Sequence, residues 1–262
     1  MQLLIDTTAR TLTRSEGGTE SSVDLYSKEA FEALSLQWVR VGWSLQYYQT
    51  FTWFGLPVLQ LPEDVLRLQE VIYAVRPLVI VETGVFQGGS LLFHASLLKA
   101  MGLDDARVIG IDIQLAASTR ENLRQYPLSH FITTIEGDSA SAEVIAQVTK
   151  AIRGCGPVLI ILDSNHTRDH VARELEAYAP LVTPGSYIIA TDGIMKDLTD
   201  VPAGQLGWKT DNPYTAAMEF AARHPEFVHE QPAWLSHDSP LVENVTYWLG
   251  AWFRRLGAGS NE

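Results

Sequence analysis

The sequence predicts an α/β fold whose sheet has seven strands, is mostly parallel and is covered by helices. Three observations predict this class. Five short aliphatic runs alternate with stretches of helical periodicity, the runs are apolar at nearly every position, and the chain of 262 residues is 46% hydrophobic. Strands without polar alternation are typical of a parallel sheet buried on both faces, and this length supports one large domain of that kind.

Residues 1–60 are expected to form an N-terminal extension, and residues 61–262 the α/β domain. Residues 1–25 are rich in Ser, Thr and Gly, so we expect them to be poorly ordered or to depend on a partner. Apolar residues recur every three or four positions over residues 27–50, which predicts a helix. A second helix is predicted over residues 62–74, which begin with proline.

The core strands are predicted at residues 78–83, 107–113, 131–135, 157–162 and 186–190. Helices are predicted between and after them, at residues 90–100, 118–125, 140–153 and 167–178. The last part of the chain adds a helix at 214–222 and strands at 226–230 and 244–249, as an antiparallel sheet edge. Right-handed crossovers bring every strand-to-helix loop to one edge, where open α/β sheets bind ligands. The residues that follow each strand are therefore the candidates for a site in this Rossmann-like arrangement.

Composition excludes several classes of partner. Nineteen basic and thirty-one acidic side chains give a formal charge of -12, which disfavours nucleic acid and anionic membranes. No run approaches the ~20 apolar residues of a membrane span, and the N-terminus does not resemble a signal peptide. The single cysteine, Cys155, excludes an intrachain disulfide and fits a reducing compartment. We therefore expect a cytoplasmic protein.

A glycine-rich turn follows the first core strand, with the sequence ETGVFQGGS at residues 82–90. Such a turn lets a ligand approach the backbone, and the following helix offers free N–H groups. The glycines do not match the dinucleotide pattern, and Glu82 would oppose a pyrophosphate. S-adenosylmethionine has no phosphate and carries a cationic amino group and sulfonium. The glycine-rich turn therefore favours this methyl donor. The alternative is that it is only a tight connection between strand and helix and binds no ligand.

Two further strand ends complete the predicted cofactor site. Asp112, with Ile113 beside it, ends the second core strand, where an acid can accept hydrogen bonds from ribose hydroxyls. Asp138 and Ser139 follow the third strand, where an adenine ring would lie. Asp138 could accept from the adenine amino group. Capping of the helix that starts near Ala140 explains Asp138 equally well.

Acidic residues also follow the fourth and fifth strands. Asp163 comes directly after an aliphatic run, and burying its charge is costly unless the carboxylate is paired or binds a metal. If the two strands are neighbours, Asp192 points into the same crevice, and the pair suits Mg²⁺. His166 and His170 stand four residues apart, but Thr167 occupies the place where a zinc protease has Glu. His170 fits a packed or surface histidine better than a ligand.

These segments resemble, in order, the cephalosporin hydroxylase family, which consists largely of S-adenosylmethionine-dependent O-methyltransferases, rhamnosyl O-methyltransferases among them. The resemblance spans Gly55 to Gly185 and covers roughly half of the chain. It is carried by LPVLQLPEDVLRLQE, VETGVFQGGSLLFHAS, VIGIDI, EGDSAS and LDSNHTRDHVARELEAYAPLVTPGSYI, and by the later DNPYTAAMEF.

The resemblance implies a class I methyltransferase fold, often assembled into homo-oligomers through the N-terminal region. It implies that the methyl donor is bound by Glu82, Gly84, Gly88, Ser90, Asp112 and Ser139, to which we add Ile113, Asp138 and Asp163. It implies a divalent metal on Asp163 and Asp192. This chain departs from the family at Thr191, where relatives carry the first of two adjacent acids. Asp197, Asn165 or the substrate could complete the metal shell.

The expected reaction is methyl transfer from S-adenosylmethionine to a hydroxyl group by in-line displacement, assisted by Mg²⁺. We expect His166 to act as general base beside Asp163, although His166 could equally cap the loop. By the resemblance, the acceptor is a hydroxyl of a sugar or glycosylated natural product. Tyr47, Tyr48 and Trp208 are candidates for its pocket walls. Trp38 and Trp43 are expected in the helical core.

The sequence leaves three other classes of function open. A non-heme iron oxygenase would need two histidines and a carboxylate, for which His166, His170 and Asp163 are the candidate set. The chain could also be a non-catalytic protein that binds S-adenosylmethionine and activates a partner. An NAD-dependent dehydrogenase is a fourth possibility.

Overall fold

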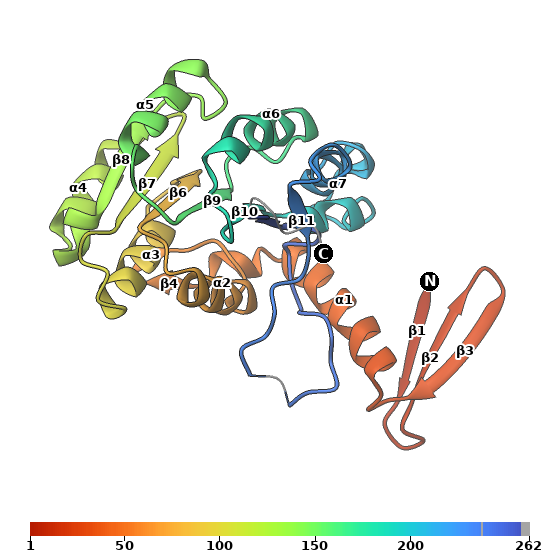
Figure 1. Ribbon diagram of the computed structural model, residues 1–262. Helices are drawn as coiled ribbons and strands as arrows, with labels where there is room; N and C mark the ends of the chain where they lie inside the picture. The colour runs from red at the N-terminus through yellow and green to blue at the C-terminus, as the bar shows by residue number, and fades with distance from the viewer. Residues whose placement is uncertain (237, 258–262) are drawn as a thin grey trace.

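The computed structural model describes residues 1–236 and 238–257. Its body is a seven-stranded sheet in the order β11-β12-β10-β9-β6-β7-β8 (Figure 1). The strands are β6 (Val79–Thr83), β7 (Arg107–Asp112), β8 (Ile132–Glu136), β9 (Val158–Leu162), β10 (Tyr187–Ala190), β11 (Phe227–His229) and β12 (Trp252–Arg255). The five strands β6 to β10 are parallel, and β12 is antiparallel to both of its neighbours. The predicted fold class is therefore confirmed.

Alternate residues of a strand point to opposite sides of the sheet, and in the central strands both sets are apolar. Helices therefore cover both faces. In β6, Ile80 belongs to one core cluster, and Val79 and Val81 belong to the other. The helices on the Ile80 side are α2 (Pro62–Val75), α3 (Gly89–Ala100) and α4 (Ala117–Gln125). Those on the other side are α5 (Ala142–Ile152), α6 (Arg168–Tyr178) and α7 (Pro213–Arg223). None of the helices in the described ranges is both long and apolar enough to cross a membrane.

The strand register aligns the carboxyl ends of the central strands. Thr83 at the end of β6 pairs with Ile111 on one side and Leu162 on the other. Leu162 in turn pairs with Ala190 of β10. The residues that follow these strand ends therefore meet at one edge, as the sequence predicts.

The N-terminal extension differs from its prediction. Residues 1–25 form an antiparallel sheet of β1 (Gln2–Asp6), β2 (Thr11–Glu16) and β3 (Thr19–Asp24), which Figure 1 shows apart from the body. Gly17 and Gly18 both have positive φ, as a two-residue hairpin turn requires. The composition rich in Ser, Thr and Gly thus belongs to a segment of hairpins, and the expectation that residues 1–25 are poorly ordered is wrong. Dependence on a partner stays a prediction, as does the boundary at residue 60.

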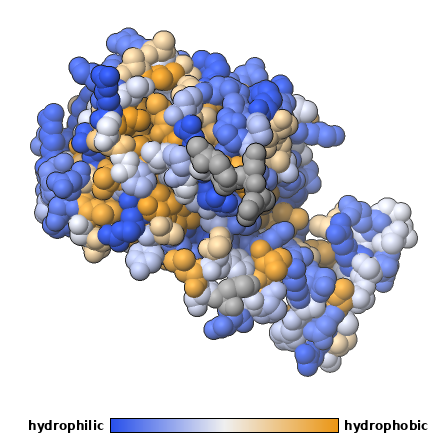
Figure 2. All heavy atoms as spheres, viewed as in Figure 1, coloured by the Kyte–Doolittle hydropathy of each residue, from blue (hydrophilic) through white to orange (hydrophobic). Residues whose placement is uncertain are grey.

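A single long helix connects this small sheet to the body. It is α1 (Lys28–Ser44), shorter than the predicted helix, and a small hairpin of β4 (Thr52–Trp53) and β5 (Leu56–Pro57) follows. Gln46 has a left-handed backbone, which ends the helical geometry before residue 50. On the face seen in Figure 2, hydrophobic surface gathers on the body, whereas the N-terminal sheet is largely hydrophilic or intermediate.

The predicted strand at residues 244–249 is wrong. The last strand is β12, a few residues further on. Val245 to Trp248 have the composition of a strand, but the backbone N–H of Tyr247 donates to a carboxylate oxygen of Asp64 instead of to a neighbouring strand. The fold thus uses this segment to line a cavity.

Candidate functional site

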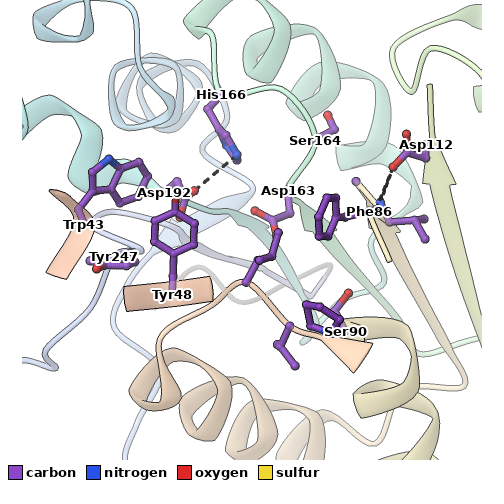
Figure 3. Close-up of a pocket in the computed structure, with 15 residues that line it drawn as sticks. Trp43, Tyr48, Phe86, Ser90, Asp112, Asp163, Ser164, His166, Asp192 and Tyr247 are labelled. Atoms are coloured by element: carbon purple, nitrogen blue, oxygen red, sulfur yellow. Dashed lines mark hydrogen bonds and ion pairs between the residues drawn. The ribbon is translucent and has the colours of Figure 1, made fainter. Parts of the chain in front are cut away.

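Two cavities lie at the carboxyl edge of the sheet. The first, of about 390 Å³, is lined by Trp43, Tyr48, Pro57, Val58, Leu59, Gly84, Val85, Phe86, Ser90, Asp112, Asp163, Ser164, His166, Asp192 and Tyr247 (Figure 3). The second, of about 310 Å³, is lined by Gly84, Ile111, Asp112, Ile113, Asp138, Ser139, Ser164, Asn165 and His170. Gly84, Asp112 and Ser164 line both cavities, so the two meet at the glycine-rich turn.

The glycine-rich turn is held in place by Asp112. One carboxylate oxygen of Asp112 accepts hydrogen bonds from the backbone N–H groups of Val85 at 2.9 Å and Phe86 at 3.0 Å. The other accepts from the N–H of Gln114 at 3.1 Å. A carboxylate has about four acceptor sites, so Asp112 keeps capacity for a ligand hydroxyl. Asp112 therefore shapes the turn as well as facing both cavities.

Glycine is required at position 84. Its φ is +85°, and a Cβ there would lie 2.1 Å from the backbone oxygen of Asp163. The absence of a side chain lets the turn after β6 pack directly on the loop after β9. Gly88 also has positive φ and precedes α3, but it lines neither cavity.

Glu82 lies beneath the site and in the wall of neither cavity. Its side chain is fully buried, and its Oε2 is 3.2 Å from Nε2 of His94 on α3. Direct contact of Glu82 with the methyl donor therefore stays a prediction. The sequence offered no signal that His94 would be its partner.

Three further residues predicted to bind the methyl donor all line the second cavity. Ile113, Asp138 and Ser139 lie in its wall. Asp138 also accepts a hydrogen bond from the backbone N–H of Ala140 at 3.0 Å, while Ser141 caps α5. Asp138 thus stabilises the turn before α5 and does not cap the helix, while its contact with the adenine amino group stays a prediction.

Asp163, His166 and Asp192 form a candidate metal centre. One potential ligand atom from each lies within 4.8 Å of the others, and this is the sole such group of three or more His, Cys, Asp or Glu in the part of the chain that the structure describes. Nε2 of His166 is 3.5 Å from Oδ2 of Asp192. Asp163 accepts from the hydroxyl of Thr191 and, at 3.3 Å, from the side-chain amide of Gln60.

The electrostatics of this centre favour a cation. Burial and repulsion from Asp192 hold the pKa of Asp163 well above its usual range. Burial likewise raises the pKa of Asp192, although His166 opposes the shift. Two adjacent carboxylates with raised pKa values gain most from a bound charge of +2, and carboxylate oxygens are the protein ligands that Mg²⁺ takes. The residues present therefore fit the predicted metal.

The set proposed for an iron oxygenase is not brought together. Nε2 of His170 lies 3.1 Å from the hydroxyl oxygen of Ser139 and 3.4 Å from a carboxylate oxygen of Glu174. His170 lines the second cavity, whereas His166 and Asp163 line the first and form the candidate metal centre. His170 is thus a packed histidine, as the sequence favours.

Aromatic rings close the far end of the first cavity. Trp43 packs edge-on against Tyr247, with ring centroids 5.2 Å apart, and lies 5.3 Å from the ring of Tyr48. Tyr48 lines the cavity as predicted, and so does Trp43, which the sequence assigned to the helical core. Tyr47 instead packs on Trp38 and Phe51. The ring of Trp208 packs against that of Trp43, with centroids 6.0 Å apart, and does not line the cavity.

Asp64 holds the segment that carries Tyr247, a role that the sequence does not reveal. This buried residue of α2 accepts from the backbone N–H of Tyr247 at 2.9 Å and from the hydroxyl of Thr246. An acid in the first turn of a helix ordinarily indicates a favourable interaction with the helix dipole. Its partners lie more than 180 residues away, so only the tertiary structure identifies them.

Replacing Asp64 with asparagine is expected to change how stability depends on pH. Burial raises the pKa of Asp64 to about 8, whereas in the unfolded chain it is about 4. The folded state therefore keeps a proton that the unfolded state loses, and the contribution of Asp64 to stability declines as pH rises from about 4 to about 8. The free energy of unfolding of the wild type, minus that of Asp64→Asn, should fall by up to about 1.4 kcal/mol per pH unit. Urea unfolding at pH 6, 7, 8 and 9 measures this difference, and a constant difference would contradict it.

Comparisons with known proteins identify the family of this chain. The sequence model of the rhamnosyl O-methyltransferase/CmcI family matches residues 45–256. A rhamnosyl O-methyltransferase of Mycobacterium leprae is 26% identical over 185 residues, which cover 70% of this chain and 76% of that protein. One of Mycobacterium tuberculosis (strain ATCC 25618 / H37Rv) is 26% identical over 151 residues, 56% of this chain and 60% of that protein.

Solved structures show the same fold. An apo structure of CmcI, 24% identical, superposes with a TM-score of 0.52 over 80% of this chain and 78% of that one. A CmcI structure with Mg and SAM, 23% identical, gives the same TM-score and coverage. Because the family's sequence model spans far more than half of the sequence, the chain belongs to the rhamnosyl O-methyltransferase/CmcI family.

Proposed function

We propose that this protein transfers the methyl group of S-adenosylmethionine to a hydroxyl group of a sugar or glycosylated natural product, with Mg²⁺ held by Asp163 and Asp192. The reaction class, S-adenosylmethionine-dependent O-methyl transfer, follows from membership of the family. The main support for the proposal is that one cavity is lined by the glycine-rich turn, by Asp112 and by the pair Asp163 and Asp192.

The second cavity suits the adenosine of the methyl donor. Asp112 stands where the two cavities meet and keeps acceptor capacity for ribose hydroxyls, while Asp138 and Ser139 border the adjoining space. Ser90, in the first turn of α3, lines the first cavity. The free N–H groups of that helix end suit the carboxylate of the methionine part. The sulfonium would then lie in the first cavity, beside Asp163.

The chain's own residues can align and deprotonate the acceptor. Bound Mg²⁺ would orient the acceptor hydroxyl and lower its pKa. We propose that Nε2 of His166, which lies in the cavity wall, takes the hydroxyl proton. The acceptor oxygen bonds to the methyl carbon as the carbon–sulfur bond breaks, and S-adenosylhomocysteine leaves with that electron pair. Holding the reactants in line supplies much of the rate enhancement.

The aromatic end of the cavity supports a sugar acceptor. Trp43, Tyr48 and Tyr247 offer flat apolar faces for the C–H groups of a sugar ring, next to polar groups for its hydroxyls. The relatives described above are named as rhamnosyl O-methyltransferases. We therefore propose a rhamnose-containing glycoside as the first acceptor to try.

Transfer of labelled methyl from S-adenosylmethionine tests this function. The purified protein is incubated with rhamnosides and with glycosides of other sugars, in Mg²⁺ or in EDTA. The proposal expects a methyl ether on a sugar hydroxyl and a strong loss of product in EDTA. Calorimetric titration with S-adenosylmethionine runs in parallel, and a folded protein that does not bind it would refute the proposal.

Replacing His166 with alanine is expected to lower kcat by about 10²- to 10⁴-fold, the range for loss of a general base. Affinity for S-adenosylmethionine should change much less than kcat, because the adenosine is proposed to lie in the second cavity, which His166 does not line. His130→Ala is a matched control, because this exposed histidine hydrogen-bonds to the backbone oxygen of Pro127 and lines neither cavity. A kcat for His166→Ala close to that of the control would refute the assignment.

We further propose that the protein is a cytoplasmic homo-oligomer that uses its N-terminal region as an interface. The lone Cys155 supports the location. Leu4 and Ile5 on β1, Val41 on α1, and Leu45 directly after α1 expose apolar side chains that a second copy could cover. Sedimentation of wild type and of a variant with lysine at Leu4 and Ile5 would test this interface.

A further inference from the structure

A buried hydrogen-bond network lies behind the second cavity. Ser139 and Ser164 come from the loops after β8 and β9, and both line this cavity. The hydroxyl of Ser139 donates to Oε1 of Glu174 at 2.6 Å, and the hydroxyl of Ser164 donates to the same oxygen at 2.8 Å. Glu174 is fully buried on α6. One carboxylate oxygen therefore receives the hydrogens of both serines.

The tautomer of His170 follows from its neighbours. A guanidinium nitrogen of Arg173 lies 3.1 Å from Nδ1 of His170. Because arginine can only donate, Nδ1 must accept, and the ring hydrogen is on Nε2. Nε2 lies 3.1 Å from the hydroxyl oxygen of Ser139 and 3.2 Å from that of Ser164. His170 thus donates toward the two serine oxygens.

This arrangement fixes what the two serines can offer a ligand. A hydroxyl has one hydrogen and two acceptor lone pairs. Both hydrogens are bound to Glu174, so Ser139 and Ser164 present only acceptors to the cavity. The carboxylate of Asp138 adds another acceptor. Among the cavity's lining side chains, Asn165 supplies a donor group, because its oxygen already accepts from the N–H of Thr167 at 3.0 Å.

We propose that Glu174 and His170 are positioning residues that make this cavity select a 6-amino purine over a 6-oxo purine. The inference rests on the proposed function, in which the cavity holds the adenosine of the methyl donor. Adenine presents an amino group with two donors beside a ring nitrogen that accepts. Hypoxanthine reverses both, with a carbonyl oxygen beside an N–H. Facing a carbonyl oxygen, the serine lone pairs would be repelled and left without a donor.

The wild-type protein provides the first test. Dissociation constants are measured by calorimetry for S-adenosylhomocysteine and for S-inosylhomocysteine, its deaminated analogue. We expect the adenosine compound to bind at least about tenfold more tightly, as for one unsatisfied buried hydrogen-bonding group. Equal affinities would overturn the inference and leave the proposed function standing. A folded protein that binds neither compound would instead refute the proposed function.

Variants then test the role of Glu174. Glu174→Ala removes the oxygen that accepts both serine hydrogens, so these hydrogens are freed to face the cavity. The ratio of the two dissociation constants should therefore fall several-fold. Tyr178→Phe is the matched control, because the hydroxyl of Tyr178 donates to the backbone oxygen of Ser139 at 2.8 Å and does not affect the serine hydroxyls. It should change both affinities alike and keep the ratio.

A second variant covers the case in which Glu174→Ala does not fold, as judged by circular dichroism. Ser164→Ala removes one of the acceptors and should also lower the ratio. If a folded Glu174→Ala or Ser164→Ala keeps the wild-type ratio, the network does not set the selectivity and the inference is wrong. If the ratio falls in these variants and not in Tyr178→Phe, the inference holds.

Discussion

Replacing Asp163 with asparagine is expected to lower kcat/KM for methyl transfer by about a thousandfold, which corresponds to about 4 kcal/mol of transition-state stabilisation. The substitution removes one of the two carboxylates proposed to hold the metal. The fold should survive it. The asparagine oxygen can still accept from Thr191, and its amide can donate to the side-chain oxygen of Gln60, which is buried without a hydrogen-bond partner in the structure.

Steady-state kinetics over a Mg²⁺ titration measure this effect. Affinity for S-adenosylmethionine in EDTA should fall far less than kcat/KM, because the nearly isosteric substitution removes one charge beside the sulfonium and leaves the adenosine contacts in place. Asp197→Asn is the matched control: Asp197 pairs with the neighbouring Lys196 and lies outside the group of potential metal ligands. Its activity should stay within about twofold, as for a pair near the surface. Full Mg²⁺-dependent activity in Asp163→Asn would exclude Asp163 as a metal ligand.

The sheet and its active edge could be predicted because parallel strands have a strong local signature. A run such as Val158 to Leu162 is buried at every position, so its composition alone indicates a strand between two helix layers. Once such strands are placed side by side, the register brings Asp112, Asp163 and Asp192 to the same edge. The local sequence pattern and the topology of a parallel sheet were sufficient to predict where these three residues lie.

The parts that were missed depend on partners distant in sequence. Val245 to Trp248 would suit a strand, but Asp64 binds their backbone and side chains instead. Glu174 looks like any helical acid, and only the packing of α6 against two loops shows that it receives two serine hydrogens. In the N-terminal sheet the hairpin signal of Gly17 and Gly18 was present, but a Ser- and Thr-rich composition also fits a disordered lead.

Replacing Asp112 with alanine is expected to weaken binding of S-adenosylmethionine by at least about a hundredfold. Two losses add here: the acceptor for the ribose hydroxyls, and the two backbone hydrogen bonds that shape the turn around Val85 and Phe86. Hydrogen bonds to charged groups contribute about 1.5–3 kcal/mol each, so loss of the ribose contact alone accounts for more than tenfold. Calorimetric titration measures the affinity.

Glu136→Ala is the control for loss of a carboxylate that holds a loop at this edge of the sheet. Glu136 is the last residue of β8 and accepts from the backbone N–H of Leu115 at 3.1 Å and from the guanidinium of Arg120 at 2.7 Å, but it lines neither cavity. Its removal should lower the free energy of unfolding and leave the affinity within about threefold, because it loses a hydrogen bond of the same kind without a ligand contact. Asp112→Asn, which keeps one acceptor oxygen for the turn, should bind with intermediate affinity. If Asp112→Ala binds as tightly as Glu136→Ala, then Asp112 serves the turn alone and the ribose must lie elsewhere.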